Sequence, residues 1–140
     1  MNPFQSLRDY EKFVYTLKRR FPSVQMSTLI IVQRGKRMAT LQGELAFAQG
    51  YRLTLKERLS FDRGPVMIED YGYELWHQEA KIAWYDAQPH PDDPALASTQ
   101  PHHKHIPPEI KHHRIPAPNM SFTQPNLPAL IREIEALLEE

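Results

Sequence analysis

The sequence contains no cysteine and only five glycines among its 140 residues, and its charges cancel. Without cysteine, disulfides, thiolate metal sites and cysteine nucleophiles are excluded. The 17 Lys and Arg equal the 17 Asp and Glu, so no overall basic excess points to a nucleic-acid partner. No apolar run reaches the roughly 18 residues of a membrane span, and the first residues lack the apolar stretch of a signal peptide. We therefore expect a cytoplasmic protein without membrane association, folded as a single domain over residues 1–140.

The balanced total conceals an uneven distribution along the chain. Residues 1–63 hold 12 Lys and Arg against 5 Asp and Glu, a net charge of +7, and residues 64–140 carry a net charge of −7. Ten of the 13 prolines lie in residues 89–128, and six of the seven histidines lie in residues 90–113. The charge asymmetry indicates a charged partner or neutralisation within the fold. The stiff, histidine-rich segment is where we expect chemistry.

Hydrophobic periodicity predicts an α+β fold. A 3.6-residue apolar period indicates an N-terminal helix over residues 1–22, and a similar stripe indicates a C-terminal helix over residues 127–140. Residues 27–88 alternate between apolar and polar side chains with short connections, which is typical of an antiparallel meander. We expect a sheet of about five strands flanked by the two helices, with a long His/Pro-rich loop over residues 89–126.

The clearest strand begins at Tyr51 and carries basic side chains on its polar face. Arg52, Lys56 and Arg58 lie an even number of residues apart, so they share one side of an extended chain. This pattern is typical of a solvated sheet face. It also fits RNA binding, because the step of about 7 Å between alternate residues is close to the spacing of nucleic-acid phosphates.

The histidine-rich segment leaves three interpretations open. His103 and His105 lie two residues apart, so the extended backbone that flanking prolines favour points them to one side and Lys104 to the other. Two imidazoles near a cation can cleave a phosphodiester without metal, because one accepts the 2′-hydroxyl proton and the other protonates the leaving oxygen. The pair could instead bind a divalent metal, with further ligands drawn from Asp86, His90 and His77. In the third interpretation the histidines only pack and form hydrogen bonds.

A short series of motifs resembles a known family. A strand ending in Tyr85-Asp86 is followed by His103-Lys104-His105, then by Phe122 and the apolar helix from Leu127. This order resembles the TumE-like family, small prokaryotic proteins assigned as toxin components of toxin–antitoxin pairs. The resemblance implies a toxin whose partner is a cognate antitoxin protein. Within this resemblance, a small antiparallel sheet flanked by helices is similar in scale to RNA-cleaving toxins, which makes RNA the candidate target.

The chain also departs from the family pattern between the aspartate and the histidines. The pattern more often has Tyr-Asp-Asn and a short glycine-containing link, whereas here Ala87 follows the aspartate. The link is long and proline-rich, over Gln88–Gln100.

Our leading hypothesis is a toxin that cleaves RNA without a metal or other cofactor. His103 and His105 would act as general base and general acid, Asp86 would orient an imidazole, and Lys104 or Arg58 would stabilise the developing charge. One alternative is a non-enzymatic binding module that docks another chain through its C-terminal helix or a sheet edge. The other is a metal-dependent hydrolase that uses the same histidines and aspartate. A homo-oligomer is compatible with each.

Overall fold

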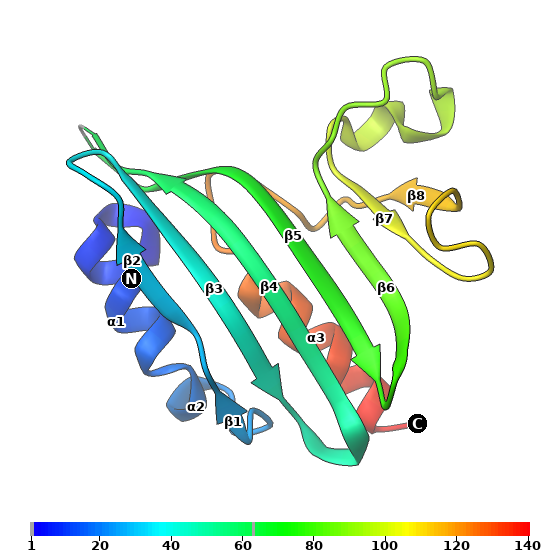
Figure 1. Cartoon of the computed structure of the whole chain (residues 1–140), viewed down its shortest axis with the longest axis horizontal. Helices are drawn as coiled ribbons and strands as arrows, with labels where there is room; N and C mark the ends of the chain where they lie inside the picture. Colours follow the sequence, from blue (N-terminus) through cyan, green and yellow to red (C-terminus); the bar gives the residue numbers. More distant parts are fainter. Residues whose placement is uncertain (1, 63) are drawn as a thin grey trace.

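The computed structural model describes residues 2–62 and 64–140 and has an α+β architecture (Figure 1). Met1, in the predicted N-terminal helix, and Arg63, in the predicted sheet, lie outside the described residues. The chain begins with the 3₁₀ helix η1 (Pro3–Gln5) and the helices α1 (Leu7–Tyr15) and α2 (Leu17–Arg20). The strands β1 to β6 follow, at Met26–Ser27, Ile30–Gln33, Met38–Ala46, Tyr51–Ser60, Met67–His77 and Ala80–Asp86, with the 3₁₀ helix η2 (Ala48–Gly50) before β4. The C-terminal part contains η3 (Pro94–Thr99), β7 (His103–His105), β8 (Arg114–Pro116) and α3 (Leu127–Leu138).

The strands form one antiparallel sheet. Both β1 and β2 pair with β3, and the order then runs β3-β4-β5-β6-β7-β8. The predicted meander is confirmed, but the expected number of about five strands is wrong, because the described residues contain eight. The strand β1 has only two residues, at the edge of the predicted sheet segment 27–88, and β7 and β8 form inside the segment expected to be a loop. Residues 89–126 are therefore not irregular throughout.

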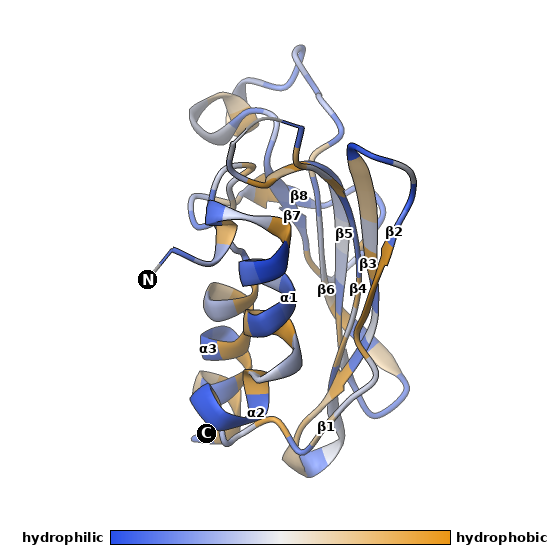
Figure 2. Cartoon of the chain, turned by 90° about the vertical axis from the view of Figure 1, so that its left-hand side faces the viewer, coloured by the Kyte–Doolittle hydropathy of each residue, from blue (hydrophilic) through white to orange (hydrophobic). Residues whose placement is uncertain are grey.

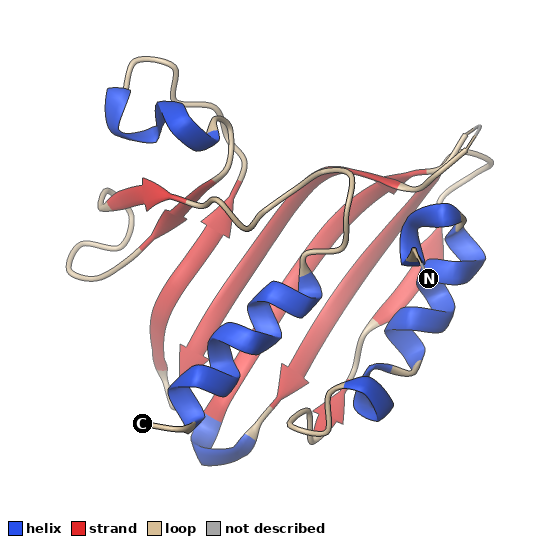
Figure 3. Ribbon diagram, turned by 180° about the vertical axis from the view of Figure 1, so that it is seen from behind, coloured by secondary structure: helices blue, strands red, loops and turns tan. Residues whose placement is uncertain are grey.

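The helices α1, α2 and α3 lie along one face of this sheet (Figures 2 and 3). Alternate residues of the strands point to the helices, as Leu53, Leu55 and Leu59 of β4 do, and they are buried. On α3, Leu130 and Ile134 complete this core. We call the opposite side of the sheet the open face, because no α-helix of the described chain covers it.

The prediction of one continuous helix over residues 1–22 is wrong, because the segment is divided into η1, α1 and α2. Ser6 has an extended backbone, and its hydroxyl accepts a hydrogen bond from the Asp9 amide, which starts α1 as an N-cap. Thr16 leaves the helical conformation, and its hydroxyl donates to the Lys12 carbonyl. Both hydroxyl residues offer the backbone local hydrogen bonds that compete with a continuous helix. The apolar period still identifies the buried side, since Phe13 and Leu17 are buried.

One charged residue lies inside this core. Glu57 of β4 is fully buried, and the hydroxyls of Tyr10 on α1 and Tyr73 on β5 donate to its carboxylate at 2.6 and 2.5 Å. Burial raises the pKa of Glu57 to about 7, although the two tyrosine hydroxyls oppose the shift. Its position in β4 has the same parity as Leu55 and Leu59, so strand alternation alone assigns it to the apolar face.

Candidate active site on the open face of the sheet

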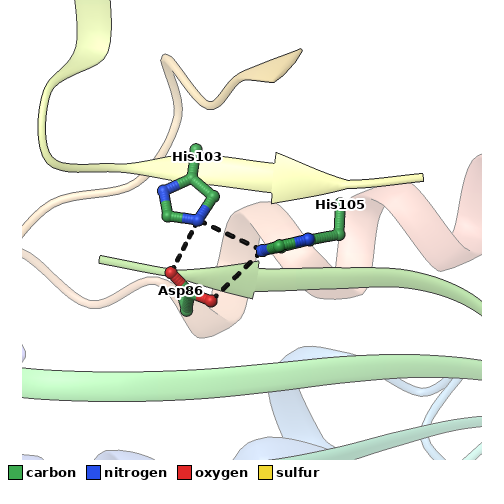
Figure 4. Close-up of side chains that lie close together, drawn as sticks. All are labelled: Asp86, His103 and His105. Carbon is green, nitrogen blue, oxygen red and sulfur yellow. Dashed lines mark hydrogen bonds and ion pairs between the residues drawn. The ribbon is translucent and has the colours of Figure 1, made fainter. Parts of the chain in front are cut away.

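Three polar side chains meet where β6 and β7 pair. Asp86 ends β6, and the register sets it opposite His103 of β7, with Trp84 opposite His105. The alternate residues Tyr85 and Lys104 point to the helix side, so the other side chains of both strands lie on the open face. Figure 4 shows the two imidazoles and the carboxylate pointing toward one another. We call these residues, Asp86, His103 and His105, the Asp–His–His cluster.

The contacts within the cluster are short. His103 Nε2 lies 2.7 Å from Asp86 Oδ1, and His105 Nε2 lies 3.3 Å from Asp86 Oδ2. The two Nε2 atoms are 3.2 Å apart. Only 1% of the His103 side chain and 3% of the His105 side chain are exposed, whereas 15% of Asp86 is exposed. The cluster is therefore nearly closed on the histidine side and reaches solvent through the carboxylate.

Backbone carbonyls hold the other nitrogen of each imidazole. His103 Nδ1 is 3.2 Å from the Pro101 carbonyl, and His105 Nδ1 is 2.7 Å from the Ile110 carbonyl. A carbonyl oxygen can only accept, so both Nδ1 atoms carry a proton. Each imidazole then directs its Nε2 atom into the cluster.

Neighbouring rings hold the imidazoles in place. Trp84 stacks on His105 with ring centroids 4.2 Å apart, and His90 meets His103 edge-to-face at 4.8 Å. His90 and the Ile110 carbonyl belong to the segments before and after β7, which explains how two histidines on the open face become buried.

Burial also makes His103 harder to protonate. It lowers the pKa of His103 below the ordinary histidine value. Asp86 and the Pro101 carbonyl oppose this shift, whereas His105 and Arg114 add to it. The pKa of His90 is also lowered, by desolvation and by the nearby Arg114. The neutral imidazole is thus favoured at both positions.

A pocket of about 290 Å³ opens beside the cluster. Its lining includes Asp86, His90 and His105 together with two cations, Lys111 and Arg114. Arg114 Nε is buried and has no hydrogen-bond partner among the residues that the structure describes. An unpaired guanidinium nitrogen beside a carboxylate–imidazole cluster suits an anionic ligand such as a phosphate.

The predicted basic residues are separated by the sheet. Lys104 lies on the helix side, where its ammonium is 2.8 Å from Glu133 of α3, so it is not part of the cluster. Arg52, Lys56 and Arg58 share the open face, but the Arg52 guanidinium is bound by Glu44 at 2.9 Å. Lys56 and Arg58 are exposed.

Of the metal ligands proposed from sequence, the structure brings Asp86, His103 and His105 together and excludes His77. His77 stacks on Tyr51 at the far end of β5 and does not approach the cluster. Among the described residues, only Asp86, His103 and His105 form a group whose ligand atoms all lie within 4.8 Å of one another. His90 remains beside this group through its ring contact with His103.

Sequence reasoning missed Trp84, Gly72 and Arg114. The register aligns Lys56, Gly72 and Asp86 in one row across β4, β5 and β6, and Gly72 leaves an opening between the other two. Arg114 joins the site because β8 pairs with β7, which sets it opposite His105. The alternation of side chains along a strand could have placed Trp84 and Gly72 on the same face as Asp86. Nothing in the sequence near Arg114 indicates that it lies beside the cluster.

The model of the family described as Toxin TumE matches residues 13–138. The chain belongs to the TumE toxin family. The resemblance predicted from the motifs around Asp86 and His103 is therefore confirmed for nearly the whole chain. No curated protein and no solved structure matches this TumE-family toxin. None of the helices in the part of the chain that the structure describes is long and apolar enough to cross a membrane.

Proposed function

We propose that this TumE-family toxin cleaves RNA at the Asp–His–His cluster and that a cognate antitoxin protein silences it. The toxin role comes from the family. The observation that carries the rest is the convergence of two imidazoles and a carboxylate on the open face, beside a pocket that contains Lys111 and Arg114. Proton transfer or water activation next to fixed cations is the chemistry that phosphodiester cleavage requires.

The open face supplies a path for an RNA strand. Lys56 and Arg58 are exposed on β4, and Asp86 lies two strands from Lys56, a distance of about 10 Å at the usual strand spacing. A Cβ at Gly72, between them, would meet no atom within 4 Å. A phosphate held by Lys56 or Arg58 would therefore place the next part of the strand over Gly72 and toward the cluster. RNA would then be the anionic partner that the net positive charge of residues 1–63 suggests.

In the metal-independent form predicted from sequence, an imidazole accepts the proton of a ribose 2′-hydroxyl. The attacking and leaving oxygens lie on opposite sides of the phosphorus, whereas the two Nε2 atoms are 3.2 Å apart and both face Asp86. Two nitrogen atoms so close together cannot reach the attacking oxygen and the leaving oxygen at the same time. We therefore assign to one imidazole the removal of the 2′-hydroxyl proton and to Arg114, in place of Lys104, the stabilisation of charge on the phosphate. As the 2′-oxygen bonds to phosphorus, the bond to the 5′-oxygen breaks, and the leaving 5′-oxygen takes its proton from solvent water in the pocket.

Hydrolysis assisted by a bound metal is the second candidate, and the same short separation favours it. A metal ion bound by the cluster would activate a water molecule and polarise the phosphate. The two forms differ in the nucleophile, which is the ribose 2′-hydroxyl in the first and water in the second.

The test compares the wild type with His103→Ala, Asp86→Asn and the matched control His112→Ala, whose imidazole is exposed in the same histidine-rich segment. We expect the wild type and His112→Ala to arrest bacterial growth on induction and to cleave RNA after purification. His103→Ala and Asp86→Asn should retain the circular dichroism spectrum of the wild type and lose both effects. If folded His103→Ala and Asp86→Asn still arrest growth, the cluster is not the active site and the binding-module alternative replaces this proposal.

The RNA products identify the nucleophile. Attack by the 2′-hydroxyl leaves a 2′,3′-cyclic phosphate and fails on a substrate with a 2′-deoxy residue at the cleaved position. Attack by water leaves a linear phosphate and tolerates the 2′-deoxy substitution. Mass spectrometry of cleaved oligonucleotides with and without this substitution separates the two forms.

A further inference from the structure

Three ligand atoms of the Asp–His–His cluster converge on one small, nearly buried space. The Nδ1 atoms of both imidazoles contact backbone carbonyls, so the two Nε2 atoms are directed toward each other and toward Asp86. The carboxylate adds a negative charge to the same space. Buried carboxylates are either paired with a charge or coordinate a metal, and here two nitrogen donors converge on the same carboxylate.

We infer that Asp86, His103 and His105 bind one divalent transition-metal ion of the zinc class. This inference rests on the proposed function in one respect: it names the cofactor of the same site. The donors are two imidazole nitrogens and one carboxylate oxygen, without sulfur. This set suits zinc and neighbouring transition metals, whereas calcium and magnesium prefer oxygen ligands alone.

The distances between the donor atoms fit a tetrahedral ion. With metal–ligand bonds of about 2.0–2.1 Å, two ligands of a tetrahedron are about 3.3–3.4 Å apart. The two Nε2 atoms are 3.2 Å apart, and His105 Nε2 is 3.3 Å from Asp86 Oδ2. The 2.7 Å separation between His103 Nε2 and Asp86 Oδ1 is shorter than this edge, so the carboxylate would rotate slightly on binding.

The surroundings of the cluster hold the ligands ready for an ion. A histidine that ligates metal through one nitrogen usually donates its other N–H to a carbonyl or carboxylate, as His103 and His105 do to Pro101 and Ile110. The stacked Trp84 ring fixes the plane of His105. Little rearrangement is therefore needed on binding, which lowers its entropic cost.

Three protein ligands leave one tetrahedral position for water or substrate, as in catalytic zinc sites. The cluster's solvent-exposed member is Asp86, which also lines the 290 Å³ pocket. Lys111 and Arg114 line the same pocket, and Arg114 Nε is buried without a partner among the described residues. A phosphate oxygen on the fourth position could pair with these cations. The site thus suits an ion that binds an anionic ester.

The direct test is metal binding by the purified full-length chain without an affinity tag of histidines. After chelation and removal of the chelator, ZnCl₂ is titrated calorimetrically, and CoCl₂ is titrated by visible absorption, which is intense for tetrahedral cobalt. We expect one ion per chain. His103→Ala and His105→Ala should weaken binding by more than the roughly 10–100-fold that loss of an outer-shell partner costs, and His112→Ala should bind as the wild type does.

Binding that is not saturable at one ion per chain, or that persists unchanged in folded His103→Ala and His105→Ala, would overturn the inference. If these variants do not fold, ¹⁵N-histidine NMR of the wild type decides. Zinc should shift the Nε2 resonances of His103 and His105 and leave the exposed His112 and His113 unchanged. A shift confined to the exposed histidines contradicts the assignment.

Metal binding is measured without RNA, so it is judged separately from the proposed function. One bound ion per chain with intact RNA overturns only the proposed function. RNA cleavage by a chain that binds no metal overturns only the metal site and supports the metal-independent form.

Discussion

Lys104 Nζ lies 2.8 Å from Glu133 Oε2, on the side of the sheet opposite to the imidazoles of His103 and His105. The ammonium also lies over the Tyr85 ring, and the Tyr85 hydroxyl donates to the other oxygen of Glu133. The central residue of the His-Lys-His motif thus connects β7 to α3, while its two neighbours form the cluster. A motif continuous in sequence is divided between two faces by the alternation of a strand.

We expect Lys104→Met to preserve RNA cleavage and growth arrest and to lower stability by no more than about 1 kcal/mol, because the ion pair is partly exposed. Urea unfolding of Lys104→Met, Glu133→Gln and the double variant measures the pair energy through a double-mutant cycle. A folded Lys104→Met chain that no longer cleaves RNA would give Lys104 the catalytic role that the sequence predicts.

Stability should depend on pH through Glu57. The folded pKa of about 7 exceeds the ordinary 4.5, so between these values the folded state holds a proton that the unfolded chain has released. The free energy of unfolding therefore falls as pH rises from about 4.5 to 7, by about 3 kcal/mol. Glu57→Gln removes this component, so its stability relative to the wild type should improve by that amount between pH 4.5 and pH 8. Urea unfolding of both proteins across this range provides the measurement, and parallel pH profiles would contradict it.

Filling the space at Gly72 should block RNA without unfolding the protein. A Cβ at Gly72 meets no atom within 4 Å, and a strand generally gains from replacing glycine, so Gly72→Leu should not lower the melting temperature. The side chain would stand between Lys56 and Asp86 and reduce RNA cleavage. Gln42→Leu is the control, because Gln42 lies in the same row on the far side of Lys56. Equal cleavage by the two variants would exclude an RNA path over Gly72.

Lys56 and Arg58 of β4, which form no ion pair with the residues that the structure describes, should contribute to RNA affinity. In a cleavage-inactive His103→Ala background, Lys56→Gln with Arg58→Gln should weaken RNA binding and reduce the slope of log affinity against log salt by about 1.4, or about 0.7 for each charge. Arg34→Gln with Lys36→Gln, exposed residues between β2 and β3, is a control of equal charge. Fluorescence anisotropy over a series of salt concentrations gives both slopes. Identical slopes for the two double variants would attribute the effect to net charge alone.

Periodicity predicts most of the fold because its main elements are long. β4 and β5 contain 10 and 11 residues, enough for alternation to be recognised, and the apolar stripe of α3 predicts a helix that begins at Leu127. β7 and β8 contain three residues each, too few for a period to show. They exist because β6 offers unpaired backbone groups to β7, and β7 in turn to β8.

Part of the candidate site follows from local geometry and part does not. The α+β class, the common side of His103 and His105 and the opposite side of Lys104 can be predicted from the sequence, because they follow from the backbone periods of helix and strand. Three contacts could not be predicted in this way: Asp86 meets both imidazoles, Arg114 lies beside them, and two tyrosines enclose Glu57. These contacts depend on which strands pair, in which register, and on which face the helices pack. Strand pairing, register and helix packing are determined by hydrogen bonds and burial between residues far apart in the sequence. A local stretch of sequence therefore does not reveal them.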